Sequence, residues 1–126
     1  MDKQSFDITA ARKFQQMKRE KRMLCLENRY KDACADFQNI VNMIIKKYNP
    51  RRIYPWGSLL NAEHFTKISD IDIAIEGLDG AESFFKLVAE AIEMTSFPLD
   101  IVELEHIHEL QKNMILKTGR LVYERD

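Results

Sequence analysis

The chain has 126 residues, 45% of them hydrophobic and 31% charged, which is enough for one compact domain with a modest core. Its 19 basic and 20 acidic side chains nearly cancel, so net charge gives no general attraction to nucleic acid or to an anionic membrane. No window approaches the roughly 18 consecutive apolar residues that a membrane span requires. With only two cysteines and no signal-like start, the sequence predicts a soluble protein of the reducing cytoplasm.

The charges are unevenly distributed along the chain. Residues 1–52 contain 13 basic and 6 acidic side chains, a net charge of +7, whereas residues 53–126 contain 6 and 14, a net charge of −8. The two parts are therefore electrostatic opposites. A basic N-terminal part could bind RNA, an acidic protein or the acidic part of a second copy of this chain.

The N-terminal part predicts helix, because residues 7–48 contain no Gly or Pro and consist mostly of good helix formers. A broad apolar stripe begins at Tyr30, whereas only a thin stripe between basic residues precedes it. A single helix of this length would run about 60 Å, so either it breaks near residues 26–29 or its first part projects as an arm. We divide the chain into two parts. Residues 1–49 contain an arm and a packing helix, and residues 50–126 form the core of the domain.

The core predicts an alternation of short helices and strands, and hence an α/β class. Asn49-Pro50 ends the first helix because proline disfavours helical geometry in the residue before it. The last helix should place Leu110, Met114 and Ile115 in the core and stop at Gly119. The periodicities predict strands over 52–56, 68–75 and 99–104, an edge strand over 121–123, a turn and short helix over 58–65, and helices over 81–94 and 105–117.

Two carboxylates stand on the second strand, in the segment Ser69-Asp70-Ile71-Asp72. Alternate residues of a strand share a face, so Asp70 and Asp72 point the same way while the isoleucines between and after them point to the core. Such a pair suits a solvated face or a divalent cation, and oxygen-only ligands favour Mg²⁺ or Mn²⁺ over zinc. On its own this pattern is typical of a solvated strand.

Gly57-Ser58 follows the first strand and opens a turn or short helix. Glycine lets the backbone approach a ligand closely, and free N–H groups with a serine hydroxyl suit a phosphate. Farther along, Asp100 interrupts an otherwise apolar strand. If this strand lies beside the one that carries Asp70 and Asp72, the three carboxylates converge, and such a triad can hold two metal ions.

These residues together resemble the nucleotidyltransferase superfamily that includes DNA polymerase beta, and in particular its minimal members. The family pattern is a Gly-Ser that opens a helix, a strand with Ser-Asp-x-Asp, and a third Asp two elements later. Gly57-Ser58, Ser69-Asp70-Ile71-Asp72 and Asp100 match it in order. The resemblance covers residues 50–126.

The resemblance implies a small α/β fold with a mixed sheet flanked by helices. It also implies an Mg²⁺-dependent enzyme, with Mn²⁺ as the alternative ion, that transfers a nucleoside monophosphate from ATP or another nucleoside triphosphate to a hydroxyl. Gly57 and Ser58 would bind the β and γ phosphates. Asp70 and Asp72 would bind both metal ions, and Asp100 the ion that activates the acceptor hydroxyl.

One departure from the family pattern concerns phosphate binding. Many minimal members carry an arginine a few residues after the Gly-Ser, and residues 59–64 contain none. Lys67, or a basic residue from a second chain, would have to supply that charge. The departure bears on activity more than on fold.

The choice of acceptor divides three hypotheses. The chain is short for a separate substrate-binding domain, and free-standing minimal nucleotidyltransferases resemble antitoxins that transfer AMP to a tyrosine of a helical HEPN toxin. We therefore expect a protein acceptor of that kind, and we expect the chain to form a homo-oligomer such as a dimer. The alternatives are a non-catalytic binding module of the same fold, and a homodimeric enzyme acting on a small molecule or RNA, so nucleic acid stays open as a partner.

Overall fold

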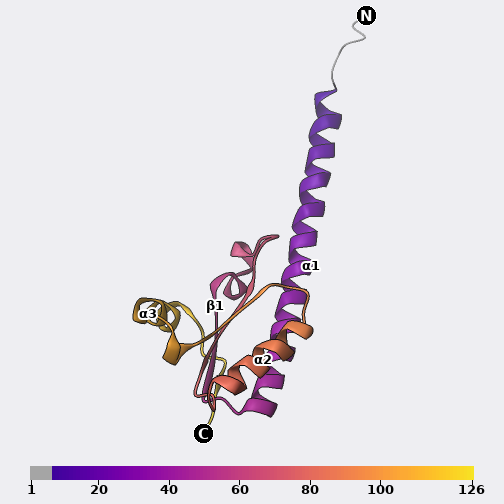
Figure 1. The fold of residues 1–126 in the computed structure, drawn as a ribbon. Helices are drawn as coiled ribbons and strands as arrows, with labels where there is room; N and C mark the ends of the chain where they lie inside the picture. Colours follow the sequence, from indigo (N-terminus) through magenta and orange to yellow (C-terminus); the bar gives the residue numbers. More distant parts are fainter. Residues whose placement is uncertain (1–6) are drawn as a thin grey trace, which may run out of the picture.

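The computed structural model describes residues 7–126 as a four-stranded mixed sheet with helices on both faces (Figure 1). This confirms the α/β class and the long N-terminal helix. The elements are α1 (Ile8–Tyr48), β1 (Arg52–Trp56), two 3₁₀ turns (Gly57–Leu60 and Ala62–His64), β2 (Ile71–Glu76), α2 (Ala81–Glu93), β3 (Leu99–Glu103), a 3₁₀ turn (Leu104–His106), α3 (Glu109–Thr118) and β4 (Tyr123–Glu124).

Helix α1 is continuous over 41 residues, so the alternative of a break near residues 26–29 is wrong. The side chain of Asp7 caps its start by accepting a hydrogen bond from the Ala10 N–H at 3.0 Å. Its end is Asn49, in the left-handed region at φ 46°, directly before Pro50. All its buried side chains lie between Ala33 and Ile44, and the earlier turns project beyond the sheet (Figure 1).

The strands lie in the order β3-β2-β1-β4. Strand β1 pairs antiparallel with both β2 and β4, whereas β2 pairs parallel with β3. Ile71, Ile73 and Ile75 of β2 are fully buried, as their alternation predicts, and they pack with residues of α1 and α2. This face of the sheet forms the main core.

The opposite face carries a smaller core under α3. Its buried centre consists of Ala74 of β2, Leu104 of the third 3₁₀ turn and Ile115 of α3. Tyr54 and Trp56 of β1 pack against this centre. Figure 1 shows the resulting layers, with α1 and α2 on one side of the strands and α3 on the other. The second face is only partly covered, which leaves the rest of it available for a site.

Three details differ from the sequence-based prediction. Strand β2 begins at Ile71 rather than at residue 68, because residues 66–69 form a turn in which Ile68 is exposed. Helix α3 begins at Glu109 because the His108 side chain caps the N–H of Leu110 at 3.1 Å. Leu110 is 75% exposed and Met114 46%, so of the three residues expected in the core only Ile115 is buried.

The end of α3 follows the prediction. Gly119 terminates it, and a Cβ at this position would lie 2.6 Å from the Ile115 carbonyl oxygen and 3.0 Å from that of Pro55. Glycine therefore lets the chain turn closely past β1 and pair as the edge strand β4. Across residues 7–126, no helix combines the length and the apolar character that a membrane crossing needs.

Candidate active site

The pairing of β2 with β3 brings two of the candidate acids together. Asp72 lies directly opposite Asp100 in the parallel register, so the two side chains share a sheet face. Asp70 directly precedes β2. The strand of Asp100 therefore lies beside that of Asp72, which is the condition under which the sequence brings these acids together.

A short turn sets the direction in which β2 enters the sheet. Ser69 is buried, and its Oγ accepts a hydrogen bond from the Thr66 N–H at 2.8 Å. The Ile71 N–H then donates to the Pro98 carbonyl at 2.9 Å, which ties the start of β2 to the segment before β3. The serine of the Ser-Asp-x-Asp segment thus positions the acids, a role that its place in the sequence did not reveal.

Gly57 approaches Asp72 from the other side of β2, where β1 ends. Strand β1 ends at Trp56, opposite Asp72, and Gly57 follows it with a φ of +76°. A Cβ built on Gly57 would collide with Oδ2 of Asp72. Both the backbone angle and the close approach therefore require glycine here. Ser58, half-buried, stands next to it in the first 3₁₀ turn.

Helix α1 supports this turn through Tyr30. The Tyr30 hydroxyl donates a hydrogen bond to the Leu59 carbonyl at 2.9 Å, while Leu59 itself is buried. The Tyr30 ring also packs edge-on against Phe65, with 5.3 Å between ring centroids. The apolar stripe of the helix placed Tyr30 at the core, but no pattern in the sequence predicted that it holds the Gly-Ser turn.

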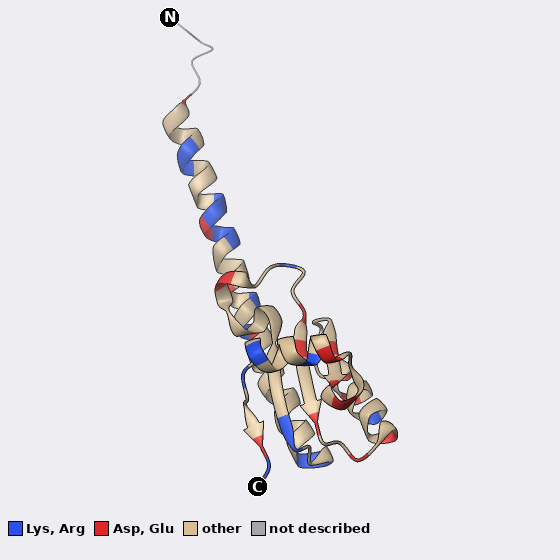
Figure 2. Cartoon of the chain, turned by 90° about the vertical axis from the view of Figure 1, so that its left-hand side faces the viewer, with Lys and Arg blue, Asp and Glu red and all other residues tan. Residues whose placement is uncertain are grey.

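The surroundings of Asp72 disfavour its ionised form. Burial, followed by the charges of Asp100 and Asp70, raises the pKa of Asp72 to about 7. A carboxyl group of this kind is half protonated near neutral pH in the absence of a compensating cation. The site therefore favours positive charge, and Figure 2 shows that acidic residues gather on the core while basic residues band the projecting part of α1.

Comparison with known proteins gives these residues a family. The model of the family described as "Polymerase beta, Nucleotidyltransferase" matches residues 38–126. The chain belongs to the polymerase beta nucleotidyltransferase family. All five candidate residues lie inside the matched range, and the part of α1 before residue 38 lies outside it. No curated protein matches the chain.

Solved structures show the same fold. A chain of a toxin–antitoxin complex with AMP-PNP superposes with a TM-score of 0.57 at 18% identity, over 70% of this chain and 73% of that one. A chain of the MntA-HepT toxin–antitoxin gives 0.55 at 17% identity, over 72% of each. A chain of a tri-AMPylated Shewanella oneidensis HEPN toxin in complex with MNT antitoxin gives 0.50 at 21% identity, over 70% and 72%.

The donor set of this family member suits a hard divalent cation. Asp70, Asp72 and Asp100 offer only carboxylate oxygens, which Mg²⁺ and Mn²⁺ prefer, and a cation would stabilise the ionised form of Asp72, which burial and then the neighbouring charges disfavour. Within residues 7–126 no three acidic, His or Cys side chains are already grouped closely enough to hold an ion. The fit therefore rests on the chemistry of the donors and on their shared face.

The family's additional arginine has no counterpart in the folded turn. Residues 59–64 form parts of two 3₁₀ turns with no basic residue other than His64. Lys67, the replacement considered from the sequence, lines a cavity against α1 together with four other cations, and none of the five candidate residues lines that cavity.

Proposed function

We propose that this chain is an Mg²⁺-dependent nucleotidyltransferase that moves AMP from ATP to a hydroxyl of a partner protein, in the manner of an MNT-type antitoxin. The observation that carries the proposal is the pairing of Asp72 with Asp100 in neighbouring parallel strands, with Gly57 packed against the Asp72 carboxylate. Membership of the polymerase beta nucleotidyltransferase family supports it.

The nucleotide would bind at the Gly57-Ser58 turn. Gly57, at φ +76°, brings its backbone directly against the Asp72 carboxylate, and the turn would offer backbone N–H groups and the Ser58 hydroxyl to the β and γ phosphates. Tyr30 fixes the turn from α1 through its hydrogen bond to Leu59. This is a positioning role, because Tyr30 acts through the backbone of the turn.

The three aspartates would hold Mg²⁺, with Mn²⁺ as the alternative ion. Asp70 and Asp72 would ligate both ions of a two-ion site, and Asp100 would ligate the one on the acceptor side. Bound Mg²⁺ would neutralise charge on the triphosphate and on the pyrophosphate that leaves when the hydroxyl oxygen bonds to the α phosphorus, and it would lower the pKa of that hydroxyl. Asp100 is exposed, which supports a role in accepting the proton of a hydroxyl that arrives from outside the chain.

The partner we propose is a helical protein of the HEPN class. The fold neighbours are chains of toxin–antitoxin complexes, one of them with AMP-PNP and one with a tri-AMPylated HEPN toxin. They support a protein acceptor over a small molecule. We place the reaction in the cytoplasm, where ATP and Mg²⁺ are available.

The proposal is tested by incubating the full chain with ATP labelled at the α phosphate, Mg²⁺ and a lysate of its source cells. We expect one labelled protein band. The Asp72→Asn variant should lose the label, because the acid between Asp70 and Asp100 is gone, whereas Asp79→Asn, an exposed acid outside the site, should keep it. Label that survives Asp72→Asn would overturn the proposal.

Two other outcomes separate the alternatives. Label in RNA or in a small molecule would favour the homodimeric enzyme. No label in any fraction, with no binding of nucleotide at millimolar concentration, would favour the non-catalytic binding module. Either result contradicts transfer to a protein.

A further inference from the structure

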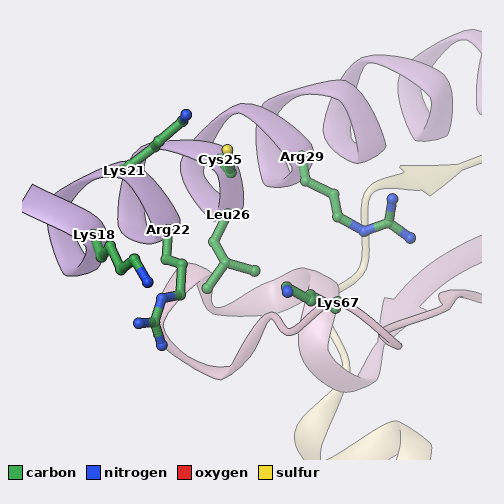
Figure 3. Close-up of a pocket in the computed structure, with 7 residues that line it drawn as sticks. All are labelled: Lys18, Lys21, Arg22, Cys25, Leu26, Arg29 and Lys67. Carbon is green, nitrogen blue, oxygen red and sulfur yellow. The ribbon is translucent and has the colours of Figure 1, made fainter. Parts of the chain in front are cut away.

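The strongest unassigned feature is a basic cavity of about 460 Å³ between α1 and the loop before β2. Five of its seven lining residues are cations, and no carboxylate lines it. Figure 3 shows Arg22 and Leu26 reaching from α1 toward the loop that carries Lys67. The lining residues are Lys18, Lys21, Arg22, Cys25, Leu26, Arg29 and Lys67.

The cations of this cavity are not neutralised by the protein itself. Among residues 7–126, none of the five forms an ion pair with a carboxylate. Arg29 is held with its guanidinium over the Phe97 ring, 4.5 Å from the ring centroid. Its Nε is buried and finds no hydrogen-bond partner within the described chain. Five unpaired cations around one hollow repel one another, and an anionic ligand would relieve that repulsion.

The spacing of the cations suits a chain of anions better than a single one. Lys18, Arg22 and Arg29 follow one another by four and seven residues, so they share a helix face, over a length of about 16 Å. Phosphates of a stacked strand follow one another at about 3.4 Å of rise. A strand along this face could therefore place several phosphates against the row.

The floor of the cavity distinguishes a nucleic acid from an acidic peptide. Leu26, Cys25 and the aliphatic stems of the lysines and arginines line it. A nucleic acid strand presents flat, largely apolar bases beside its phosphates. Its bases could therefore contact the apolar floor of the cavity while its phosphates contact the cations. The chain's net charge is −1, so binding here would come from this local cluster and not from the protein's overall charge.

We propose that the cavity between α1 and the loop of Lys67 binds single-stranded nucleic acid through its phosphates. The site goes beyond the proposed transfer of AMP to a protein, because Gly57, Ser58 and the three aspartates do not line it. Its cations come mainly from the part of α1 that precedes the residues matched by the family model.

The test is the fluorescence anisotropy of a labelled mixed-sequence RNA decamer titrated with the full chain at about 50 mM salt. A triple variant with Lys18→Gln, Arg22→Gln and Lys67→Gln removes three exposed cations of the cavity. The matched control carries Arg12→Gln, Lys13→Gln and Arg19→Gln, which removes three exposed cations of the same helix outside the cavity. All six positions are exposed, so unchanged circular dichroism should confirm that both variants fold.

We expect the cavity variant to bind RNA at least about 10-fold more weakly and the control variant to stay within about 3-fold of the unmodified chain. The slope of log K against log salt should decrease in magnitude by about 2 in the cavity variant, because about 0.7 counterions are released per phosphate contact of a single strand. Equal loss in both variants, or no binding by the unmodified chain, would overturn the proposal. Equally effective displacement by a decaglutamate peptide or by inorganic tripolyphosphate would overturn it too.

Discussion

Gly57 lies directly against Asp72 in the candidate site. The glycine adopts φ +76° and leaves no room for a Cβ beside the Asp72 carboxylate. The acid in turn faces Asp100 across the parallel pair. The position of the Gly-Ser turn relative to the acids therefore depends on one missing methyl group.

Replacing Gly57 by alanine tests that contact. A left-handed backbone angle costs an alanine about 1–2 kcal/mol, and the collision with Asp72 adds a further cost of about 1–3 kcal/mol for overpacking. We expect Gly57→Ala to lose about 3 kcal/mol of unfolding free energy in urea and to lose ATP binding. Gly80→Ala is the matched control, because Gly80 has φ +103° and open space around it. It should lose only the backbone cost and keep ATP binding, and equal effects at both positions would refute the role of the contact.

Asp72 predicts a pH dependence of stability. Its pKa is raised to about 7 in the folded chain and is about 3.9 in an unfolded one. Between these values the folded chain retains a proton that the unfolded chain has released, so the unfolding free energy falls as pH rises from about 4 to about 7. The half-buried position reduces this effect by solvent screening, and we expect a loss of about 1–2 kcal/mol.

The Asp72→Asn variant should remove that slope. In metal-free buffer at pH 8 we expect it to be about 1–2 kcal/mol more stable than the unmodified chain, and to be insensitive to added Mg²⁺, whereas Mg²⁺ should stabilise the unmodified chain. Urea unfolding at pH 5 and pH 8, with and without Mg²⁺, measures both effects. An unmodified chain whose stability rises between these pH values would contradict the account of Asp72.

At the scale of elements, α1 has two different relations to the core. Residues 33–44 contribute buried side chains, and Tyr30 holds the turn after β1. No residue of 7–32 is buried, and this arm exposes apolar side chains such as Phe14, Met17 and Met23 among its cations. The C-terminal part of the helix therefore packs in the core, whereas most side chains of its N-terminal part are exposed to solvent or to a partner.

Tyr30→Phe should separate stability from nucleotide binding. Loss of the hydrogen bond to the Leu59 carbonyl should cost about 1 kcal/mol and loosen the turn, weakening ATP binding by about 3–10-fold. Tyr48→Phe is the control on the same helix, because its hydroxyl donates to Glu90 at 2.6 Å, between α1 and α2. It should cost a similar stability and leave ATP affinity unchanged. Equal ATP affinities in the two variants would show that Tyr30 does not position the nucleotide-binding turn.

Deleting residues 1–24 tests the division between arm and core. Because buried side chains of α1 begin at Ala33, we expect the unfolding free energy to change by less than about 1 kcal/mol, as measured by urea unfolding. A loss above about 3 kcal/mol would show that the arm belongs to the core. Sedimentation of the full chain and of the shortened chain tests the role of the arm in the expected homodimer. An unchanged number of chains per particle would show that the arm does not hold two copies together.

At the scale of the whole molecule, the site was more predictable than the elements around it. Strict alternation in 70–75 identified both the buried isoleucines and the shared face of the acids, because a strand has a fixed period of two. The order of Gly57-Ser58, Asp70, Asp72 and Asp100 indicated the family before any geometry was available. The adjacency of β2 and β3 remained an open condition in the sequence, since alternation does not report which strands pair.

Other features depend on contacts between distant segments, and a local pattern does not contain them. The continuity of α1 was also not predictable, because its exposed arm has helix-forming residues but no buried stripe whose periodicity would show that the helix continues. Leu110 and Met114 are exposed and only Ile115 reaches the core, and the periodicity of the helix alone does not show which part of its apolar face meets the sheet. The hydrogen bond between Tyr30 and Leu59 joins residues 29 positions apart. The cavity likewise combines α1 with a loop more than 35 residues later.

The most direct test of the central claim is calorimetric titration of the full chain with a non-hydrolysable ATP analogue in the presence of Mg²⁺. The account predicts binding at one site per chain, lost when Mg²⁺ is removed and lost in Asp70→Asn and in Asp72→Asn, while Asp79→Asn binds as the unmodified chain does. No heat of binding at millimolar analogue, or binding that persists in both aspartate variants, would contradict it.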